Sequence, residues 1–557
     1  MTQSANQTPS ETAPRRKNGN AGSERVDIVI IGAGFAGMYM LHKARELGLS
    51  AVVLDKANGV GGTWYWNRYP GARCDVDSIQ YSYSFDEDLQ QEWEWSEFYA
   101  TQPEILRYAN HVADRYDLRR DMRFNTAVVS ATFVEGANGK RTGHWLVETQ
   151  GEHAGRIEAS FCVMGTGCLS TPNKPKIEGL DDFAGETYHT GLWPHEAVDF
   201  TGKRVAVIGT GSSAIQSIPE IAKQAAHLTV FQRTPNYTIP ARNHPLDPVE
   251  YTKTKARYRE LREEAKKQPN GLFYDFNPKG ALEVSEEERR AEFERRWAVG
   301  GTMFVGAYAD LMKNTDANET AAEFVRSKIR EIVEDPETAE KLSPDNVFGC
   351  KRLCVDTDYW ATYNRDNIEL VDVSDEPIER ILPEGVKVGG KVYEVDALVL
   401  ATGFDAMTGA MLNIDIRGRG GLPLREKWAE GPYNYLGLAV AGFPNMFMVA
   451  AVGSPAVFAN VLTGIEQHIV WIADCLGYMN EKGLGEIEAE EAAEADWTEH
   501  MREIGEASLR SQCDSWYVGA NIPGKPRVFT PYIGTVPDYD KRCDEAARKG
   551  YEGFRLL

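Results

Sequence analysis

Two glycine-rich turns of the same kind constrain the fold of this chain more than any other feature. The first turn joins the apolar run 26–31 to a helical pattern and contains Gly32, Gly34 and Gly37. In a β-turn-α-β unit these glycines make a tight turn, let backbone amides approach a pyrophosphate and let the helix pack closely on the strand. The next strand ends on Asp55, which can accept hydrogen bonds from a ribose. The first turn therefore predicts a dinucleotide site.

A second copy of the turn begins 177 positions later, with Gly209, Gly211, Ser212 and Ser213 at its centre. Its second strand ends not on an acid but on Arg233. A guanidinium at this place suits the 2'-phosphate of NADPH, where an NADH site would carry a carboxylate. The alternative is that Arg233 is an ordinary surface charge.

The two turns together predict a flavoprotein. In one site the second strand ends on an acid, and in the other it ends on a base. This pair of sites indicates that electrons pass from a nicotinamide to a second dinucleotide, most naturally FAD. The predicted fold class is α/β, with two Rossmann-like dinucleotide-binding domains and a helical insertion in the NADPH domain. Charged helical patterns fill the insertion, including a capping box at Ser285, and a further acidic helix is expected over 486–497.

Two buried strands are expected to end at a glycine, in the segments 161–167 and 397–403. They mark where the chain passes between the nucleotide domains. The predicted division is a disordered tail, a first FAD segment, a first NADPH segment, the helical insertion, a second NADPH segment and a second FAD segment with the substrate pocket. The respective ranges are 1–25, 26–168, 169–241, 242–346, 347–400 and 401–557.

Composition excludes several classes of protein. A formal charge of −22 disfavours binding to nucleic acid or to an anionic membrane. The uncharged stretch 431–465 is interrupted by proline and glycine, so we expect buried strand and loop there, not a membrane span. Eight cysteines without a C-x-x-C pair predict a reduced, cytoplasmic protein without disulfides. Cys350 and Cys354 lack further ligands, so no metal site is expected.

Two longer motifs identify a family. Residues 183–194 fit F-x-G-x-x-x-H-x-x-x-W-P at every fixed position, with His189 as the histidine, and residues 61–75 read GGTWYWNRYPGARCD. Both segments resemble signatures of type I Baeyer–Villiger monooxygenases, and the resemblance runs from about Val26 to the C-terminus. Related flavoproteins that oxidise nitrogen or sulfur share the turns and the histidine, but usually lack Trp193-Pro194 and the Asp75 segment.

The resemblance implies a reaction. NADPH reduces FAD, O2 adds to the reduced flavin, and the peroxide anion inserts one oxygen into a ketone, which becomes an ester or a lactone. Arg352 matches the family's catalytic arginine, a cation that cannot be titrated away, and Asp75 matches its carboxylate partner. His189 is expected to be a hydrogen-bonded residue of an interdomain connection with a conformational role, not a proton carrier.

The resemblance also assigns binding residues. Lys351, Arg233 and Thr234 match the 2'-phosphate contacts, and Trp516 matches a mobile control loop that reaches the nicotinamide ribose, although it could simply fill core. The segment 454–460 looks like the phenylacetone and steroid monooxygenase branch, which implies aryl, bulky or larger cyclic ketones. The further predicted contacts are Thr63 and Trp64 for the flavin, and Leu169, Ser454, Ala456, Val457 and Phe458 for the substrate.

Two rival functions stay open at this point. An amine or sulfide oxygenase could use the same scaffold, and a redox-sensing module could hold both nucleotides without turnover. The expected partner is a small-molecule ketone, with no nucleic acid and no membrane, and the chain could be a monomer or a dimer.

Overall fold

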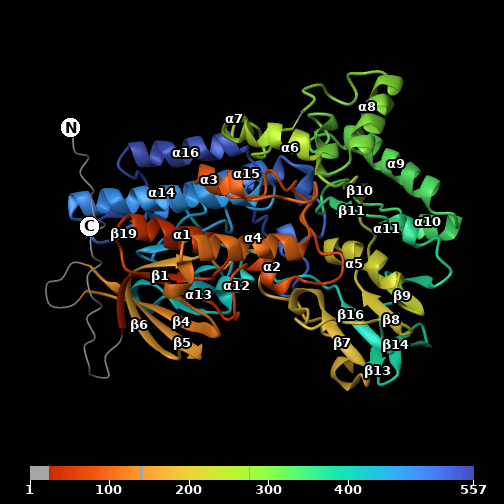
Figure 1. Ribbon diagram of the computed structural model, residues 1–557, viewed down its shortest axis with the longest axis horizontal. Coiled ribbons are helices and arrows are strands. Elements are labelled where there is room, and N and C mark those ends of the chain that lie inside the picture. The colour runs from red at the N-terminus through yellow and green to blue at the C-terminus, as the bar shows by residue number, and fades with distance from the viewer. Residues whose placement is uncertain (1–23, 137–141, 275) are drawn as a thin grey trace, which may run out of the picture.

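The computed structural model describes residues 24–136, 142–274 and 276–557, and its two largest sheets, one mixed and one parallel, lie beside each other (Figure 1). Of the predicted N-terminal tail, residues 1–23 lie outside the described residues. Glu24 and Arg25 already belong to the first strand, so the tail was predicted slightly too long. The α/β fold class is confirmed.

The first sheet has eight strands, in the order β17-β4-β5-β6-β1-β2-β3, with β18 also on β6. Its centre is the predicted β-turn-α-β unit, because the apolar residues of β1 and β2 are buried from both sides. β1 pairs in parallel with β2 and β6, whereas β5 pairs antiparallel with β4 and β6. The strands are β1 (Glu24–Ile31), β2 (Ala51–Leu54), β3 (Met122–Arg123), β4 (Thr126–Val134), β5 (His144–Gly151), β6 (Gly155–Met164), β17 (Asp415–Arg417) and β18 (Met446–Met448).

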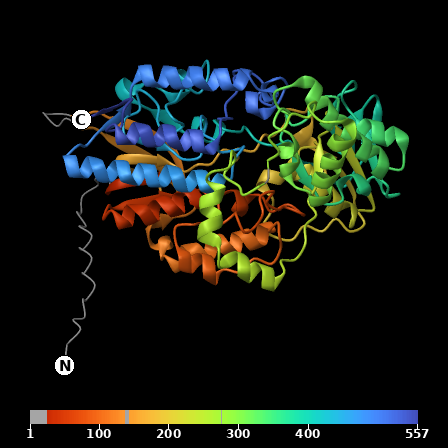
Figure 2. The same ribbon diagram turned by 90° about the horizontal axis from the view of Figure 1, so that it is seen from above.

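Helices from both ends of the chain cover the first sheet. Helix α1 (Phe35–Glu46), directly after the first glycine turn, packs against α14 (Val461–Lys482), and α14 packs against α16 (Val536–Arg548). Figure 2 shows the red N-terminal and blue C-terminal helices lying together over this half of the molecule. The 401–557 part of the chain therefore completes the domain that the first turn begins.

The second sheet is wholly parallel, in the order β12-β9-β8-β16-β7. Its central strands are mostly apolar and buried, as expected for strands covered on both faces. Helix α5 (Ser212–Ala222) follows the second glycine turn. The strands are β7 (Glu186–His189), β8 (Arg204–Ile208), β9 (His227–Gln232), β12 (Ile368–Asp372) and β16 (Ala397–Leu400).

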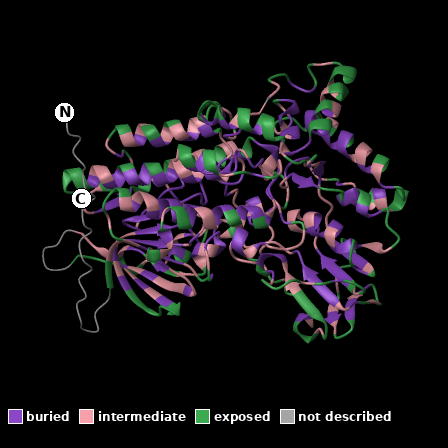
Figure 3. Ribbon diagram, in the orientation of Figure 1, coloured by how far each residue is buried: buried purple, intermediate pink, exposed green. Residues whose placement is uncertain are grey.

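The predicted helical insertion is confirmed. The hydroxyl of Ser285 accepts a hydrogen bond from the Glu288 amide at 3.2 Å and caps α8. Exposed and buried residues alternate along these helices (Figure 3). The helices are α6 (Pro248–Lys255), α7 (Tyr258–Ala265), α8 (Glu286–Val299), α9 (Thr315–Ile332) and α10 (Pro336–Leu342).

The acidic helix expected over 486–497 was placed wrongly. Its first residues form the buried strand β19 (Ile487–Ala489), which pairs with β20 (Phe554–Leu556), and helix α15 runs from Glu491 to Glu506. The carboxylates of Glu486 and Glu488 bind Arg419, so charge that looked like a solvated helix face is paired inside the fold.

The uncharged stretch 431–465 is largely buried loop with the strand β18, and α14 begins at its end. Within the part of the chain that the structure describes, every helix is too short or too polar to traverse a bilayer.

Two connections join the sheets and run side by side. The amide of Asn173 donates to the Gly403 carbonyl at 2.9 Å, and the amide of Asp405 donates to the Thr171 carbonyl at 2.9 Å. An isolated antiparallel bridge joins Pro172 and Phe404 between them. The chain thus leaves and re-enters the first domain at one place.

Short elements complete the chain. They are α2 (Thr63–Trp66), α3 (Glu87–Glu92), α4 (Gln102–Arg115), β10 (Thr238–Pro240), β11 (Cys354–Asp356), α11 (Tyr359–Thr362), β13 (Arg380–Leu382), β14 (Gly385–Val388), β15 (Lys391–Glu394), α12 (Gly409–Leu412) and α13 (Leu424–Lys427).

Candidate active site

The first glycine turn is packed so tightly that two of its residues must be glycine. Gly32 has a φ of 108°, and a Cβ there would lie 2.4 Å from the carbonyl oxygen of Gly165. A Cβ on Gly37 would lie 1.8 Å from the carbonyl oxygen of Gly32. The turn therefore brings the start of α1 against the end of β1, as a pyrophosphate cradle at a helix N-terminus requires.

Asp55 lies at the end of β2 and faces this cradle. Its carboxylate accepts hydrogen bonds from the amides of Ala33, at 2.6 Å, and Ala57, at 2.8 Å. Burial raises the pKa of Asp55, while these two amides act in the opposite direction. The carboxylate is held at the rim of the turn, where an acceptor for a ribose is expected.

The segment with Thr63 and Trp64 closes over the same turn. The amide of Gly61 donates to the Ala33 carbonyl at 3.1 Å, and helix α2 starts at Thr63. The indole of Trp64 donates to the Tyr81 hydroxyl at 2.9 Å, which fixes the ring in the core. The structure thus brings the predicted flavin-contact residues of both segments together.

The second turn repeats this backbone but leaves more room. Gly209 has a φ of 114°, and a Cβ there would lie 2.5 Å from the Ala401 carbonyl oxygen. No heavy atom lies within 4 Å of the place a Cβ would take on Gly211. Ser212 and Ser213 begin α5, so their amides lie in the first turn of a helix beside open space. This geometry fits a second pyrophosphate.

Two cations lie beside the second turn without a paired acid. Burial and the positive charge of Arg233 lower the pKa of Lys351. Arg233 is exposed, and within the described residues neither cation has a carboxylate oxygen within 4.0 Å. The carbonyl of neighbouring Thr234 accepts from the Thr210 hydroxyl at 2.7 Å, which fixes this strand end. Two positive charges held close together favour the binding of an anion between them.

Arg352 is held from two sides. Its Nε and Nη2 atoms donate to Oδ2 of Asp75 at 3.1 and 2.5 Å, and its Nη1 atom donates to the backbone carbonyl of Val457 at 2.9 Å. The Asp75 carboxylate raises the pKa of Arg352, so the guanidinium is charged at every working pH. The predicted catalytic pair and one predicted substrate residue therefore meet in a single cluster.

His189 lies at the end of β7, beside the paired connections between the sheets. Its Nδ1 atom accepts from the Gly191 amide at 2.9 Å, so Nε2 carries the proton and faces the Asn173 carbonyl at 3.3 Å. The Thr402 hydroxyl is also 3.3 Å from Nε2. Burial lowers the pKa of His189, which keeps the ring neutral. Through these contacts His189 joins the two connections between the sheets by hydrogen bonds.

Trp516 and the substrate segment meet through a residue that sequence reasoning missed. The ring of Tyr517 lies 4.3 Å from that of Trp516 and 4.6 Å from that of Phe458, centre to centre. Arg510, also missed, lies over the Phe458 ring at 4.5 Å. Tyr517 directly follows the predicted Trp516, which is a signal for it in the sequence, whereas no motif marks Arg510.

The other predicted substrate residues differ in position. Ala456 and Val457 are buried, and Ser454 is buried with its hydroxyl donating to the Ala451 carbonyl at 2.7 Å. Leu169 lies at the first connection between the sheets, partly buried against the core of the first domain. Ser454 therefore holds the turn of its own segment.

The expectation of no disulfide is wrong. The Sγ atoms of Cys350 and Cys513 are bonded at 2.20 Å, across 163 positions of sequence. No local spacing rule can reveal a pair so far apart. Cys354 stays a free thiol whose pKa is raised by burial to about 12. The described residues contain no group of three or more His, Cys, Asp or Glu side chains able to hold a metal ion.

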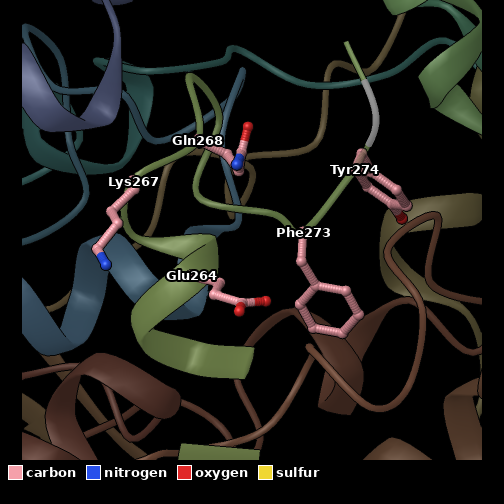
Figure 4. Close-up of a pocket in the computed structure, with 5 residues that line it drawn as sticks. All are labelled: Glu264, Lys267, Gln268, Phe273 and Tyr274. Carbon is pink, nitrogen blue, oxygen red and sulfur yellow. The ribbon is translucent and has the colours of Figure 1, made fainter. Parts of the chain in front are cut away.

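A cavity of 280 Å³ lies apart from the predicted site residues, between the end of α7 and the segment that follows it (Figure 4). The Tyr274 hydroxyl at its edge donates to Asp77 at 3.0 Å, two residues from Asp75. The cavity is lined by Glu264, Lys267, Gln268, Phe273 and Tyr274.

Comparisons with known proteins agree with this geometry. Residues 29–267 match the family model described as pyridine nucleotide-disulphide oxidoreductase. The chain is 41% identical to a Baeyer-Villiger monooxygenase of Pseudooceanicola batsensis, over 94% of this chain and 95% of that protein. It is 40% identical to the phenazine N-monooxygenase PhzNO1 of Lysobacter antibioticus, over 95% of this chain and 97% of that protein.

Two solved structures are similar over nearly their full length. An oxidized steroid monooxygenase bound to NADP is 50% identical, with a TM-score of 0.90 and coverage of 96% of this chain and 99% of that chain. An OTEMO complex with FAD and NADP is 40% identical, with a TM-score of 0.91 and coverage of 96% and 100%.

Proposed function

Because this chain belongs to the Baeyer–Villiger monooxygenases, which use FAD, NADPH and O2 to convert ketones to esters or lactones, we propose that it acts on aryl, bulky or larger cyclic ketones, with Arg352 as the catalytic cation. The observation that carries the proposal is the double anchoring of Arg352. Its guanidinium binds Asp75 of the first domain and the main chain of the substrate segment at Val457.

The flavin, when bound, supplies the activated oxygen, and NADPH supplies the electrons. Arg352 would hold a permanent positive charge where negative charge develops as oxygen is inserted next to the carbonyl. Asp75 fixes the direction of the guanidinium, so little reorganisation is needed during the reaction. His189 would act only on the connection between the domains.

The two nucleotide turns divide the cofactors between them. We propose that Gly32, Gly34, Gly37, Asp55, Thr63 and Trp64 hold FAD, and that Gly209, Gly211, Ser212, Ser213, Arg233, Thr234 and Lys351 hold NADPH. Arg233 and Lys351 support this order, because neither forms an ion pair among the described residues and a 2'-phosphate would neutralise their charges. The six-segment division of the chain given above stays part of the proposal, with the first FAD segment beginning at Glu24.

The substrate class rests on the segment 454–458 and the aromatic side chains beside it. Phe458 lies near Tyr517, and its ring is stacked on that of Phe529 at 6.3 Å. Such a wall favours a large apolar or aromatic ketone over a small polar one. The 50% identity to the steroid monooxygenase points the same way.

A ketone panel tests the proposal. Purified, FAD-loaded protein is given NADPH, O2 and phenylacetone, a steroid ketone, cyclohexanone or acetone, and the products are identified by mass spectrometry. We expect ester or lactone from the first three, with a higher kcat/KM for the two bulky ketones than for acetone. A preference for acetone would contradict the proposed substrate class.

N-oxidation is the second candidate, because the phenazine N-monooxygenase is as similar in sequence as several ketone oxygenases. The same assay with phenazines, amines and sulfides separates the two. Oxidised heteroatom products without ester from any ketone would favour N- or S-oxygenation.

A further inference from the structure

We propose that Cys350 and Cys513 form a reversible redox modification site, in which a peroxide closes the disulfide and a dithiol opens it. The bond joins the loop of the catalytic arginine to the segment of Trp516, with Cα atoms 6.0 Å apart. Its predicted effect is to control how fast the Trp516 segment moves, and so how fast NADP leaves. This last step rests on the proposed role of Trp516.

The position of the bond is its main support. Cys350 directly precedes Lys351 and Arg352, and Cys513 lies three residues before Trp516. The disulfide therefore links the loop of Arg352 directly to the segment of Trp516.

Weaker, non-covalent contacts hold the segment on both sides of Cys513. Arg510 donates through Nη1 to the Gly349 carbonyl at 3.1 Å, and the Leu509 amide donates to the Met312 carbonyl at 3.0 Å. Beyond Cys513 the segment is held by the first domain, where Asn521 donates to the Phe404 carbonyl at 2.7 Å. The disulfide lies between these anchors, so opening it frees residues 514–520 from their covalent anchor.

The two sulfurs differ in access. Cys350 is fully buried, whereas Cys513 is partly exposed. Among the free cysteines of the described chain, Cys168 is partly exposed and the others are buried. An incoming reagent can therefore reach Cys513 and leaves the buried thiols untouched.

The chemistry balances with hydrogen peroxide as oxidant. The Cys513 thiolate attacks one peroxide oxygen, the O–O bond breaks, and a sulfenic acid forms as hydroxide leaves and takes up the proton that the thiol had lost, giving water. The Cys350 thiol then attacks that sulfur, forms the S–S bond and releases a second water. Two thiols are oxidised and one peroxide is reduced to two waters. In reverse, a dithiol attacks Cys513, releases the Cys350 thiol, and closes its own disulfide.

The test compares peroxide-treated and dithiothreitol-treated holoenzyme after both reagents are removed. Peptide mapping without reduction should find Cys350 linked to Cys513 in the oxidised sample alone. Amide hydrogen exchange over 514–520 should be at least threefold slower in the oxidised protein, and NADP+ should dissociate at least threefold more slowly. The comparison needs no variant, so a folding defect cannot obscure it.

Two variants complete the design. Cys513→Ser should behave like the reduced protein after either treatment, whereas Cys168→Ser, at the other partly exposed cysteine, should keep the full redox response. No linked peptide, equal exchange over 514–520, or equal NADP+ dissociation in the two states would overturn the proposal. Ester formation is measured in parallel: its absence in both states contradicts the proposed function, while the exchange result still decides the redox site.

Discussion

The two nucleotide turns have the same backbone and opposite surroundings. A Cβ on Gly34 of the first turn would lie 3.4 Å from Gly62, whereas the corresponding space at Gly211 of the second turn is open. The first turn is faced by the Asp55 carboxylate, and the second is flanked by Arg233 and Lys351. One site is enclosed and acidic, the other open and basic.

This difference separates a resident cofactor from an exchanging one. An enclosed site with an acceptor for ribose suits FAD, which stays bound through many turnovers. An open site with two cations that form no ion pair within the described residues suits NADPH, which must enter and leave and is recognised by its phosphate. The same local fold thus serves two roles, and the neighbouring residues decide which.

The largest expected effect is at the residue that lies between the two sites. Arg352→Ala should lower the rate of ester formation by about 100- to 1000-fold, the usual range when one charge-stabilising group is removed. FAD content and flavin reduction by NADPH should stay, because Arg352 belongs to neither turn. Product analysis and stopped-flow absorbance measure the two effects. Arg330→Ala, an exposed arginine of α9, is the control, and ester formation at its level by Arg352→Ala would refute the assignment.

The second prediction concerns the basic site alone. Arg233→Ala should lower kcat/KM for NADPH by about 10- to 100-fold, since a charge-assisted contact contributes roughly 1.5–3 kcal/mol, and should change NADH little. Steady-state kinetics with both cofactors measure it. Asp55→Asn is the counterpart in the acidic site: it should weaken FAD retention and leave the NADPH preference unchanged. Equal losses for NADPH and NADH in Arg233→Ala would remove the 2'-phosphate assignment.

A matched pair of glycine substitutions sharpens the contrast between enclosed and open. Gly37→Ala would place a Cβ 1.8 Å from a backbone oxygen, so the free energy of unfolding should fall by about 1–3 kcal/mol or more, with loss of FAD. Gly211→Ala has free space and should leave stability unchanged while raising the KM for NADPH. Thermal unfolding and flavin absorbance distinguish the two. Equal destabilisation would mean that the second turn is as closed as the first.

The smallest effect is a pH dependence. Burial and Arg233 lower the pKa of Lys351, so its positive charge is lost at a lower pH than that of a free lysine. The KM for NADPH should therefore rise severalfold as the pH increases, and this rise should begin below the pH at which an ordinary lysine loses its charge. Arg233→Ala removes one cause of the lowered pKa and should move this rise to higher pH. If the KM for NADPH rose at the same pH in both proteins, the charge of Arg233 would not be a cause of the lowered pKa of Lys351.

Much of this architecture was predictable from local sequence. The strand that ends at Ile208 and the helix that Ser285 caps follow from hydrophobic runs, glycine turns and capping residues, which act over a few positions. The meeting of Arg352 with Asp75 was predictable only through family resemblance, because these residues are 277 positions apart.

The failures at Glu486 and Glu488, at Cys350 and at Arg510 share one physical cause: the decisive partner is distant in sequence. Glu486 and Glu488 looked like an exposed helix face until Arg419 paired with them. Folding of the whole chain brings Cys350 to Cys513, to which it is disulfide-bonded, and Arg510 to the ring of Phe458. Single-residue patterns carry no signal for such pairs.

The contact between Arg352 and Val457 has one more consequence. The guanidinium binds a main-chain oxygen, which every amino acid supplies equally. Selection in nature or in the laboratory could therefore exchange the side chains around position 457 and redirect the enzyme toward new molecules without loosening its reactive centre. The changes would be confined to one short segment, and the hydrogen bond that holds Arg352 would be kept because it is made to the backbone.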